Sequence, residues 1–433
     1  MTTQRLLSPF ETTFFGTATK LGSVPTAGMP LYIGTTVRGT IDAEILRRVL
    51  GELAAGHPLL RSRVLTDADG ALWFQRDDAY EPALHIGEGG TAEYMKLVNS
   101  HQNWRDGLFH ARLLRGGGYD RIVLVIHHGI ADGRSAFALL DELWRRYTGH
   151  LAGAPLPLSN SDQRLPEAVD VQLAAVTSDA EVEEFLELVR TGALAMDPAA
   201  APRALPRDGD GAGRDPLGRF GMERIELTEQ ETVGLVATAR AHGLSVNSLL
   251  TGAALAAWRA QLEPVTGPLP MLAGHAVDVR YELVPRLSES TMLNCASGIG
   301  TPAEVGEDAN PIELGLLAAA GVRAALDRHE ASVFLLAAQR VRDELTAAIF
   351  AAQPTMAISN IGRMPAHPMP EGVTAVRDDI FAMGPGMPPK LTVFTVGGEL
   401  TIQVEYDTAE HSRGQMGKVT LALVEALRDV RVA

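Results

Sequence analysis

The sequence predicts a mixed α/β protein made of two halves of similar length. Apolar residues recur at helical spacing in some segments and at strand spacing in others, and the two patterns alternate along the 433 residues. A stretch rich in proline and glycine interrupts them near the middle of the chain, and a new strand pattern starts at Met222. We therefore expect an N-terminal half over residues 1–175, a connecting segment over 176–221 and a C-terminal half over 222–433.

The first half alternates helix and strand patterns. An amphipathic helix pattern ends at Gly56, and β-rich runs over residues 60–65 and 71–75 flank a turn sequence, which predicts a hairpin. Residues 121–126 form a nearly uninterrupted apolar run with several β-branched members, which is typical of a strand buried on both faces. A helix with one apolar stripe follows over residues 135–147.

The second half repeats this mixture, and the pair Thr228 and Glu231 has the spacing of a capping box. The predicted strands cover residues 222–227, 270–280, 292–299, 355–361, 374–382, 391–396 and 400–406. The predicted helices cover residues 228–243, 246–262, 311–329, 333–351 and 413–430. The loop over 383–390 has no regular pattern, and we expect it either to cross between the halves, with Met383 and Met387 lining an apolar channel, or to be an ordinary surface loop.

Composition and charge argue against several classes of protein. The 53 acidic and 38 basic residues give a formal net charge of −15, which is unfavourable for binding the phosphate backbone of nucleic acid. Cys295 is the only cysteine, so no internal disulfide can form, which fits a reducing cytoplasm. The segment Met1–Lys20 lacks the apolar core of a signal peptide, and no apolar run is long enough to span a membrane. We expect a cytoplasmic monomer that does not bind nucleic acid.

The sharpest chemical pattern is the segment His127–Gly133 (HHGIADG), which lies between the buried strand and the following helix. Because successive strand side chains point to opposite faces, one histidine can enter a pocket while the other packs in the interior. Gly129 and Gly133 predict a sharp turn of the backbone at the strand exit. A histidine is largely neutral at neutral pH, so it suits a general base.

Two other interpretations of this segment stay open. The two histidines can be an ordinary buried pair in a turn, or they can join Asp132 as ligands of a metal ion. A metal site needs further ligands, and the sequence has neither an HExxH pattern nor a cysteine–histidine cluster to supply them, so we expect no metal. No GxSxG pattern is present, and Cys295 is expected to be a small buried residue rather than a nucleophile.

The pattern HHxxxDG resembles the active-site motif of the chloramphenicol acetyltransferase-like superfamily. This superfamily includes condensation domains of nonribosomal peptide synthesis and polyketide-associated (Pap-type) acyltransferases. Further segments that resemble its motifs are Leu7–Glu11 (the start of Pap-type enzymes), His57–Arg63 (HPxLR), Val277–Arg280 (DLR) and Ser359–Gly362 (SNxG). The likeness covers nearly the whole chain and is closest to Pap-type enzymes of the phthiocerol/phthiodiolone dimycocerosyl transferase kind.

This resemblance implies a pseudo-dimer of two similar halves with a central tunnel, in which His128 is the general base. It implies that His127 and Gly133 complete the motif, and that Asp132 pairs with Arg280 to shape the site, for which we expect bidentate geometry. The acyl donor would be a thioester of CoA or of the phosphopantetheine on an acyl carrier protein, with no further cofactor. The acceptor would be a small molecule with a hydroxyl group.

Several polar residues are weaker candidates. Those for substrate binding are Asn294, Ser297, Ser359 and Asn360. Their side chains can hydrogen-bond a pantetheine arm or an oxyanion, or they can be ordinary polar groups of strands and turns. The candidates for a basic patch that receives an acidic carrier protein are Arg145, Arg146 and Arg164.

With the resemblance, the sequence predicts an acyltransferase that moves an acyl group from a thioester to a hydroxyl group of a natural product or lipid. Two alternatives stay open: an amide-forming condensation enzyme of the nonribosomal peptide type, and a non-catalytic homologue that docks a carrier protein. The intact His128 argues against the non-catalytic alternative, because docking does not need this side chain.

Overall fold

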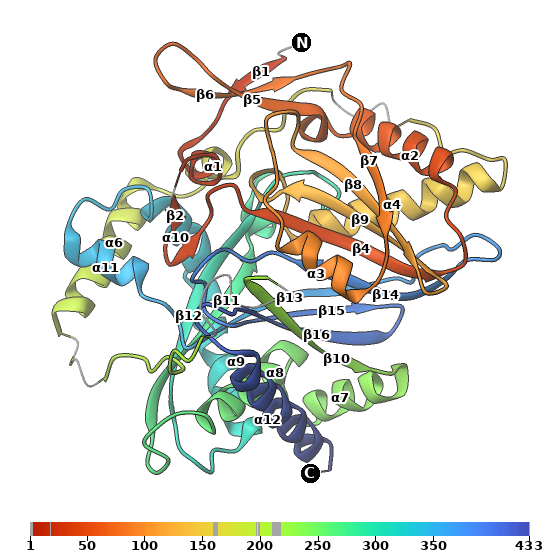
Figure 1. The fold of residues 1–433 in the computed structure, drawn as a ribbon. Helices are drawn as coiled ribbons and strands as arrows, with labels where there is room; N and C mark the ends of the chain where they lie inside the picture. The colour runs from red at the N-terminus through yellow and green to blue at the C-terminus, as the bar shows by residue number, and fades with distance from the viewer. Residues whose placement is uncertain are drawn as a thin grey trace.

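Two large β-sheets lie one above the other in the computed structural model, and helices cover their outer faces (Figure 1). The structure describes residues 3–17, 19–158, 163–195, 197, 200–209 and 218–432. Its strands are β1 (Gln4–Leu6), β2 (Lys20–Leu21), β3 (Val24–Pro25), β4 (Pro30–Arg38), β5 (Ser62–Thr66), β6 (Leu72–Arg76), β7 (Leu84–Glu88), β8 (Phe109–Gly116), β9 (Tyr119–His127), β10 (Phe220–Leu227), β11 (Leu269–Asp278), β12 (Ala296–Val305), β13 (Met356–Met364), β14 (Thr374–Phe381), β15 (Lys390–Val396) and β16 (Glu399–Asp407).

The helices are distributed along the whole chain. They are α1 (Pro9–Phe15), α2 (Ala43–Gly56), α3 (Thr91–Val98), α4 (Gly133–Leu151), α5 (Val169–Ala174), α6 (Asp179–Ala195), α7 (Glu229–Ala241), α8 (Val246–Arg259), α9 (Pro311–Asp327), α10 (Glu330–Ala337), α11 (Glu344–Ala351) and α12 (Arg413–Val432). Short 3₁₀ turns are η1 (Pro58–Arg61), η2 (His128–Ile130) and η4 (Val279–Glu282). Among the residues described, no helix is both long enough and apolar enough to cross a membrane.

The two large sheets confirm the mixed α/β fold class. The first has the strand order β14-β4-β9-β8-β7, and the second has the order β10-β16-β15-β13-β11-β12. In the first sheet only β7 and β8 are parallel, whereas in the second β13 runs parallel to both β11 and β15. A separate small sheet, β1-β6-β5, contains the hairpin predicted over residues 60–75.

One strand of the second half lies in the sheet of the first. β14 pairs antiparallel with β4, whereas β15, the next strand along the chain, belongs to the second sheet. The segment between them therefore crosses from one sheet to the other, as the first of the two alternatives for the loop over 383–390 predicted. Met383 and Met387 within this segment are buried. The division at residues 176–221 stays a prediction, and residues 196, 198–199 and 210–217 of that segment lie outside the described part of the chain.

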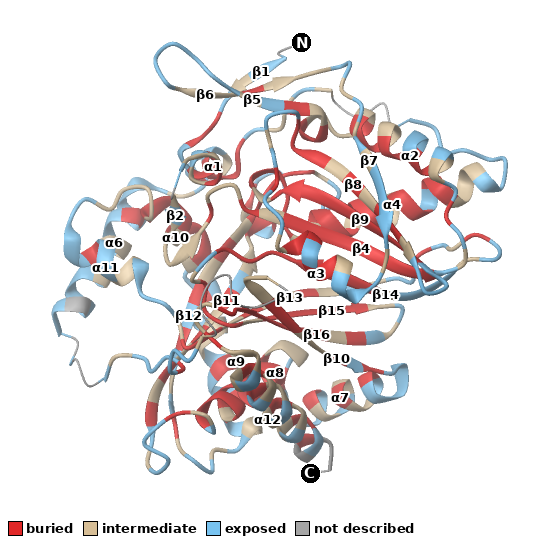
Figure 2. Cartoon of the chain, viewed as in Figure 1, coloured by how far each residue is buried: buried red, intermediate tan, exposed pale blue. Residues whose placement is uncertain are grey.

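Strand β9, which leads to the histidine pair, lies in the interior of the first half. Every residue of β9 from Asp120 to His127 is buried, which confirms the prediction of a strand covered on both faces. Helix α4 packs on this sheet through the predicted apolar stripe, and Figure 2 shows the same concentration of buried residues in β4, β8 and β9. The end of β9 is thereby held in rigid packing.

Several boundaries differ from the prediction for physical reasons. The helix predicted over 333–351 is two helices, because Asp343 accepts a hydrogen bond from the Thr346 N–H and caps a new start. The strand predicted over 292–299 begins only at Ala296. The backbone before it is irregular because Leu293 and the residues beside it bind groups of the candidate site instead of a neighbouring strand.

Candidate active site

The segment His127–Gly133 joins β9 to α4 through the short turn η2. His127 is the last residue of β9, and η2 follows directly. Asp132 is the N-cap of α4: its carboxylate accepts a hydrogen bond from the Ser135 N–H at 3.0 Å, and the Ser135 hydroxyl lies 3.0 Å from the Asp132 N–H as its acceptor. The sequence thus stops the strand and starts the helix within five residues, with both histidines at the junction.

His127 packs in the interior. Its ring stacks on Phe15 with centroids 4.0 Å apart and meets the edge of Trp104 at 4.9 Å. Its Nδ1 accepts a hydrogen bond from the Gly129 N–H at 3.0 Å. Burial, and to a smaller extent the neighbouring His128, lower the pKa of His127 to about 3. This histidine is therefore neutral and positions the turn.

His128 is half-buried and is held from the second half of the chain. Asn294 donates a hydrogen bond from Nδ2 to the His128 carbonyl oxygen at 2.9 Å, and the same Nδ2 lies 3.3 Å from the His128 Nδ1. The His128 N–H donates to the Met29 carbonyl oxygen at 2.9 Å, and the ring of Phe14 lies 5.8 Å from the imidazole. Residues far from His128 in the sequence therefore hold both its backbone and its imidazole ring.

The electrostatic surroundings keep His128 neutral at neutral pH. Burial lowers its pKa and the Lys390 charge adds to this, whereas hydrogen bonds to the backbone of His128 and Ala131 and the charge of Asp132 oppose it. The pKa remains below the ordinary value for histidine. A neutral imidazole has one nitrogen free to accept a proton, which is what a general base requires.

Gly129 and Gly133 let neighbouring side chains approach the backbone closely, and neither has an unusual backbone angle. Neither glycine has a positive φ, so the expected sharp turn is not the reason for them. A Cβ at Gly129 would lie 2.8 Å from the Phe15 ring, and a Cβ at Gly133 would lie 3.0 Å from the Ile361 side chain. The start of α4 therefore lies directly against β13, the strand of the SNxG segment.

Asp132 and Arg280 form a buried ion pair between the two halves. The Arg280 Nη1 donates to the Asp132 Oδ2 at 2.6 Å and to the Asp278 Oδ1 at 3.1 Å, whereas Nη2 donates to the Leu293 carbonyl oxygen at 2.9 Å. The expected bidentate geometry is therefore wrong, because the second nitrogen of the fork holds the irregular backbone before β12. Burial lowers the pKa of Arg280, but the Asp132 charge raises it above its ordinary value.

Cys295 belongs to the same buried network. Its N–H donates to the Asp132 Oδ2 at 2.8 Å, and its thiol is buried. Burial raises the pKa of this thiol far above its ordinary value, which disfavours the thiolate form that a nucleophile requires.

The weaker candidates separate into those near His128 and those bound elsewhere. Asn294 contacts His128, and its Oδ1 accepts from the Ala296 N–H, so its polar atoms are engaged within the protein. The Ser297 hydroxyl donates to the Ala331 carbonyl oxygen at 2.6 Å, toward α10. Ser359 pairs in regular register on β13, whereas Asn360 lies at an irregularity of this strand and lines a cavity of about 390 Å³ beside α7 and α8.

The surroundings of the two histidines include three residues that were not predicted from the sequence: Phe14, Phe15 and Lys390. Helix α1, which carries Phe14 and Phe15, is opened by a capping box between Ser8 and Glu11, and this spacing was a readable signal. Lys390 had no such signal, because its position depends on the crossing segment. Its Nζ donates to the Ala382 carbonyl oxygen at 2.7 Å and lies 3.0 Å from the buried Glu405.

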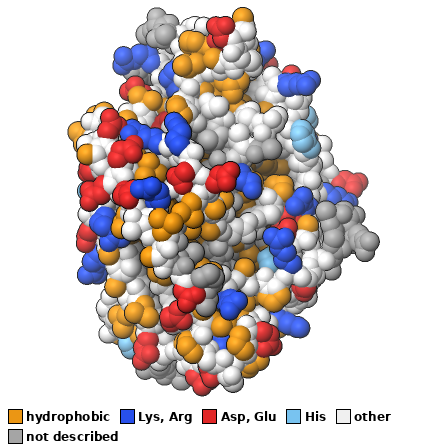
Figure 3. Space-filling view, turned by 90° about the vertical axis from the view of Figure 1, so that its left-hand side faces the viewer, with side chains coloured by type: hydrophobic (Ala, Val, Ile, Leu, Met, Phe, Trp, Pro, Cys, Tyr) orange, Lys and Arg blue, Asp and Glu red, His pale blue; other side chains and the backbone are white. Residues whose placement is uncertain are grey.

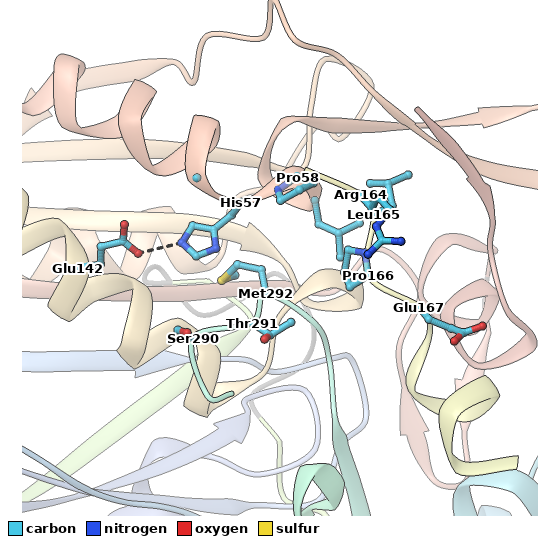
Figure 4. A pocket seen from close by; sticks show the side chains of 12 residues that line it. His57, Pro58, Glu142, Arg164, Leu165, Pro166, Glu167, Ser290, Thr291 and Met292 are labelled. Atoms are coloured by element: carbon cyan, nitrogen blue, oxygen red, sulfur yellow. Dashed lines mark hydrogen bonds and ion pairs between the residues drawn. The ribbon is translucent and has the colours of Figure 1, made fainter. Parts of the chain in front are cut away.

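A second cavity lies beside the HPxLR segment. It measures about 640 Å³ and is lined by η1, α4, residues 164–167 and residues 290–292. In Figure 4 the His57 ring points toward Glu142, and their side chains meet at 2.9 Å. Met292, which also lines this cavity, is only two residues from Asn294. The cavity therefore adjoins the backbone that holds His128.

Two of the three arginines suggested for a basic patch are bound by acids of their own surroundings. Arg146 is buried, with Nε 2.8 Å from Glu142 and Nη1 3.4 Å from Glu52, and Arg145 pairs with Asp141 at 2.7 Å. On the face drawn in Figure 3, basic, acidic and hydrophobic side chains are interspersed. The described residues contain no group of three or more His, Cys, Asp or Glu side chains placed to hold a metal ion.

The arrangement of two sheets and their covering helices is shared with solved structures. The fold is similar to polyketide synthase associated protein 5 from Mycobacterium tuberculosis (TM-score 0.70, 22% identity, 93% of this chain and 94% of that one). It is also similar to a trichothecene 15-O-acetyltransferase from Fusarium sporotrichioides (TM-score 0.76, 13% identity, 99% and 96% of the chains). The chain therefore has the two-lobed fold of chloramphenicol acetyltransferase-like enzymes and condensation domains.

The sequence comparisons place the chain more narrowly. Residues 216–405 match the model of the phthiocerol/phthiodiolone dimycocerosyl transferase C-terminus. A phthiocerol/phthiodiolone dimycocerosyl transferase from Mycobacterium leprae is 30% identical over 317 residues, which are 67% of this chain and 68% of that protein. The protein belongs to this family of acyltransferases.

Proposed function

We propose that the protein transfers an acyl group from a thioester to a hydroxyl group, with His128 as the general base. The observation that carries this proposal is the state of His128: it is neutral, half-buried and held by Asn294 across the junction of the two halves. The names of the relatives support acyl transfer to lipids, and one structural neighbour is named an O-acetyltransferase.

The proposed reaction needs one proton carrier and no covalent enzyme intermediate. The free nitrogen of His128 takes the proton of the acceptor hydroxyl as its oxygen attacks the thioester carbonyl carbon. The tetrahedral intermediate then breaks its C–S bond, and the thiolate receives the proton from the imidazolium. The products are an ester and a free thiol. The thiolate leaves in preference to the alkoxide because a thiol, with a pKa of about 8.5, is a much stronger acid than an alcohol.

The surrounding contacts support this role for His128. The Asp132–Arg280 pair and the Asn294 amide hold the turn η2 from the second half of the chain. The base therefore keeps one orientation through the reaction, which lowers the cost of reorganisation. Asn294 is proposed to position His128 and not to bind substrate.

The donor and the setting remain proposals of the same kind. The donor is a thioester of CoA or of carrier-bound phosphopantetheine, and no additional cofactor takes part. The acceptor is a hydroxyl of a natural product or lipid. We propose a cytoplasmic location because a single cysteine suits a reducing compartment. We also propose that the enzyme is a monomer.

An amide-forming condensation reaction is the second candidate, because condensation domains share the fold (TM-score 0.69 with the first condensation domain of the CDA synthetase). The test incubates the protein with acyl-CoA and matched alcohols and amines, and measures free thiol and product mass. Ester formation with alcohols supports the proposal, whereas products from amines alone support condensation. Thiol release without any acceptor product would contradict both.

A further inference from the structure

Three arginines converge on one buried aspartate where the two sheets meet. Arg121 comes from β9, Arg224 from β10 and Arg377 from β14, the strand that also carries Asp379. The Arg224 Nη2 lies 2.6 Å from the Asp379 Oδ1, and the Arg121 Nη2 and Arg377 Nε lie 3.7 and 3.6 Å from Oδ2. We call these four residues the arginine cluster. The arginine cluster connects β9 and β14 of the first sheet to β10 of the second sheet.

The arginine cluster carries more positive than negative charge. Asp379 balances one of its three guanidinium groups, and the nearby Lys390 and Glu405 pair with each other at 3.0 Å. Burial lowers the pKa of Arg121, and although Asp379 raises it, the charges of the other two arginines lower it again. An excess of buried positive charge is unfavourable unless an anion joins it.

Several buried polar atoms of the cluster have no hydrogen-bond partner among the residues that the structure describes: the Arg121 Nη1, the Arg224 Nη2, the Arg377 Nε and the Asp379 Oδ2. The Arg224 and Arg377 nitrogens still face Asp379 as ion pairs, whereas Arg121 faces Asp379 through its other terminal nitrogen, Nη2. The hydroxyl of the neighbouring Tyr94, whose ring lies under the Arg121 guanidinium at 4.6 Å from its centroid, has no hydrogen-bond partner either. The Arg121 side chain is 6% exposed and Tyr94 is fully buried, so bulk water does not satisfy them. Arg377 is 27% exposed, so the cluster reaches the surface.

We propose that the arginine cluster binds the phosphate group of the thioester donor, at the far end of its pantetheine arm. Surplus guanidinium donors around a single carboxylate suit a phosphate, which offers several oxygens and at least one full charge. This inference rests on the proposed function, because it assigns the donor's charged end to a place on the chain. CoA and carrier-bound phosphopantetheine share this phosphate.

The position of the cluster fits the length of the arm. Arg121 and His127 lie on the same face of β9, six residues apart, which corresponds to roughly 20 Å at the rise of a strand. The arm has about 13 bonds between sulfur and phosphorus, which extend to roughly 15 Å at the rise of a peptide chain. The reach of the arginine side chains covers the remaining distance. A phosphate at the cluster would therefore leave the thioester near His128.

The test compares the binding of pantetheine and 4′-phosphopantetheine, which differ by the phosphate alone, by isothermal titration calorimetry. The wild-type protein should bind the phosphorylated compound at least about tenfold more tightly, the gain from one charge-assisted hydrogen bond. Arg224→Met and Arg377→Met should lose this preference while binding pantetheine as before. Arg328→Met, on an exposed arginine paired with Glu330, is the matched control and should keep it.

Equal affinity of the wild-type protein for both compounds would overturn the inference. So would an equal loss of both affinities in the variants, which would assign the cluster a purely structural role. Arg377→Met is the second variant in case Arg224→Met does not fold, because Arg377 is partly exposed. CoA as a third ligand separates the sources: tighter binding than 4′-phosphopantetheine indicates CoA, and equal or weaker binding indicates a carrier. Since the readout is binding, selective binding without acyl transfer would refute the proposed function but not the phosphate site.

Discussion

Removing the negative charge of Asp132 tests whether the motif aspartate shapes the site or takes part in chemistry. Asp132→Asn keeps an oxygen that can cap α4 through the Ser135 N–H but leaves the buried Arg280 without its 2.6 Å partner. Breaking a buried pair costs about 3–5 kcal/mol, and because Asp278 still contacts Arg280 at 3.1 Å we expect about 3 kcal/mol. For 433 residues the unfolding entropy near Tm is roughly 0.9 kcal/mol/K, so Tm should fall by about 3 °C.

The assay is thermal denaturation by circular dichroism beside the thiol-release rate with acyl-CoA. Glu44→Gln, which removes an exposed ion pair of α2, is the control and should leave both quantities unchanged. The account predicts that Asp132→Asn lowers Tm and rate together, and that Arg280→Met in the same chain restores part of the lost stability. An unchanged Tm with a large loss of rate would refute this reasoning and assign Asp132 a direct catalytic role.

Three further predictions concern the surroundings of the histidines. Asn294→Ala should lower kcat about tenfold with little change in KM, because the amide orients His128 and does not touch substrate; a change in KM alone, in steady-state kinetics, would point to substrate binding. The profile of kcat/KM against pH should fall only on the acid side of the ordinary histidine pKa, because the pKa of His128 is lowered; a midpoint above 7 contradicts this. Burial lowers the pKa of His367, but Asp141 and Asp378 raise it to about 9, so the stability that it contributes is full below pH 6.5 and is lost as pH rises toward 9. His367→Gln should therefore lower Tm more at pH 6 than at pH 9, and an equal effect at both would contradict this assignment.

The parts of the fold that were predictable carry strong local signals. β9 is a run of apolar residues buried on both faces, and the Thr228–Glu231 capping box opens α7 as its spacing indicates. β4 was missed although it is an interior strand of the first sheet. Its run of Gly34 and two threonines has no clear alternation, and it becomes a strand because β9 and β14 pair with it on both sides.

The candidate site could be predicted only where one segment carries it. The segment His127–Gly133 and its likeness to a known motif led to His128, and the same likeness suggested Arg280 as the partner of Asp132. The position of Asn294 against His128 depends on irregular backbone that only the folded chain forms, and the sequence predicted a strand there. The three arginines around Asp379 belong to three different strands, so no local pattern could group them.

The central claim is that His128 is the proton acceptor of acyl transfer. The most direct measurement is the rate of thiol release from acyl-CoA in the presence of an alcohol acceptor, for the wild-type protein and for His128→Ala. A general base contributes typically 10²–10⁴-fold, so the account predicts a loss of about that size while the melting curve stays close to that of the wild type. A folded His128→Ala variant that keeps nearly the wild-type rate would contradict the account.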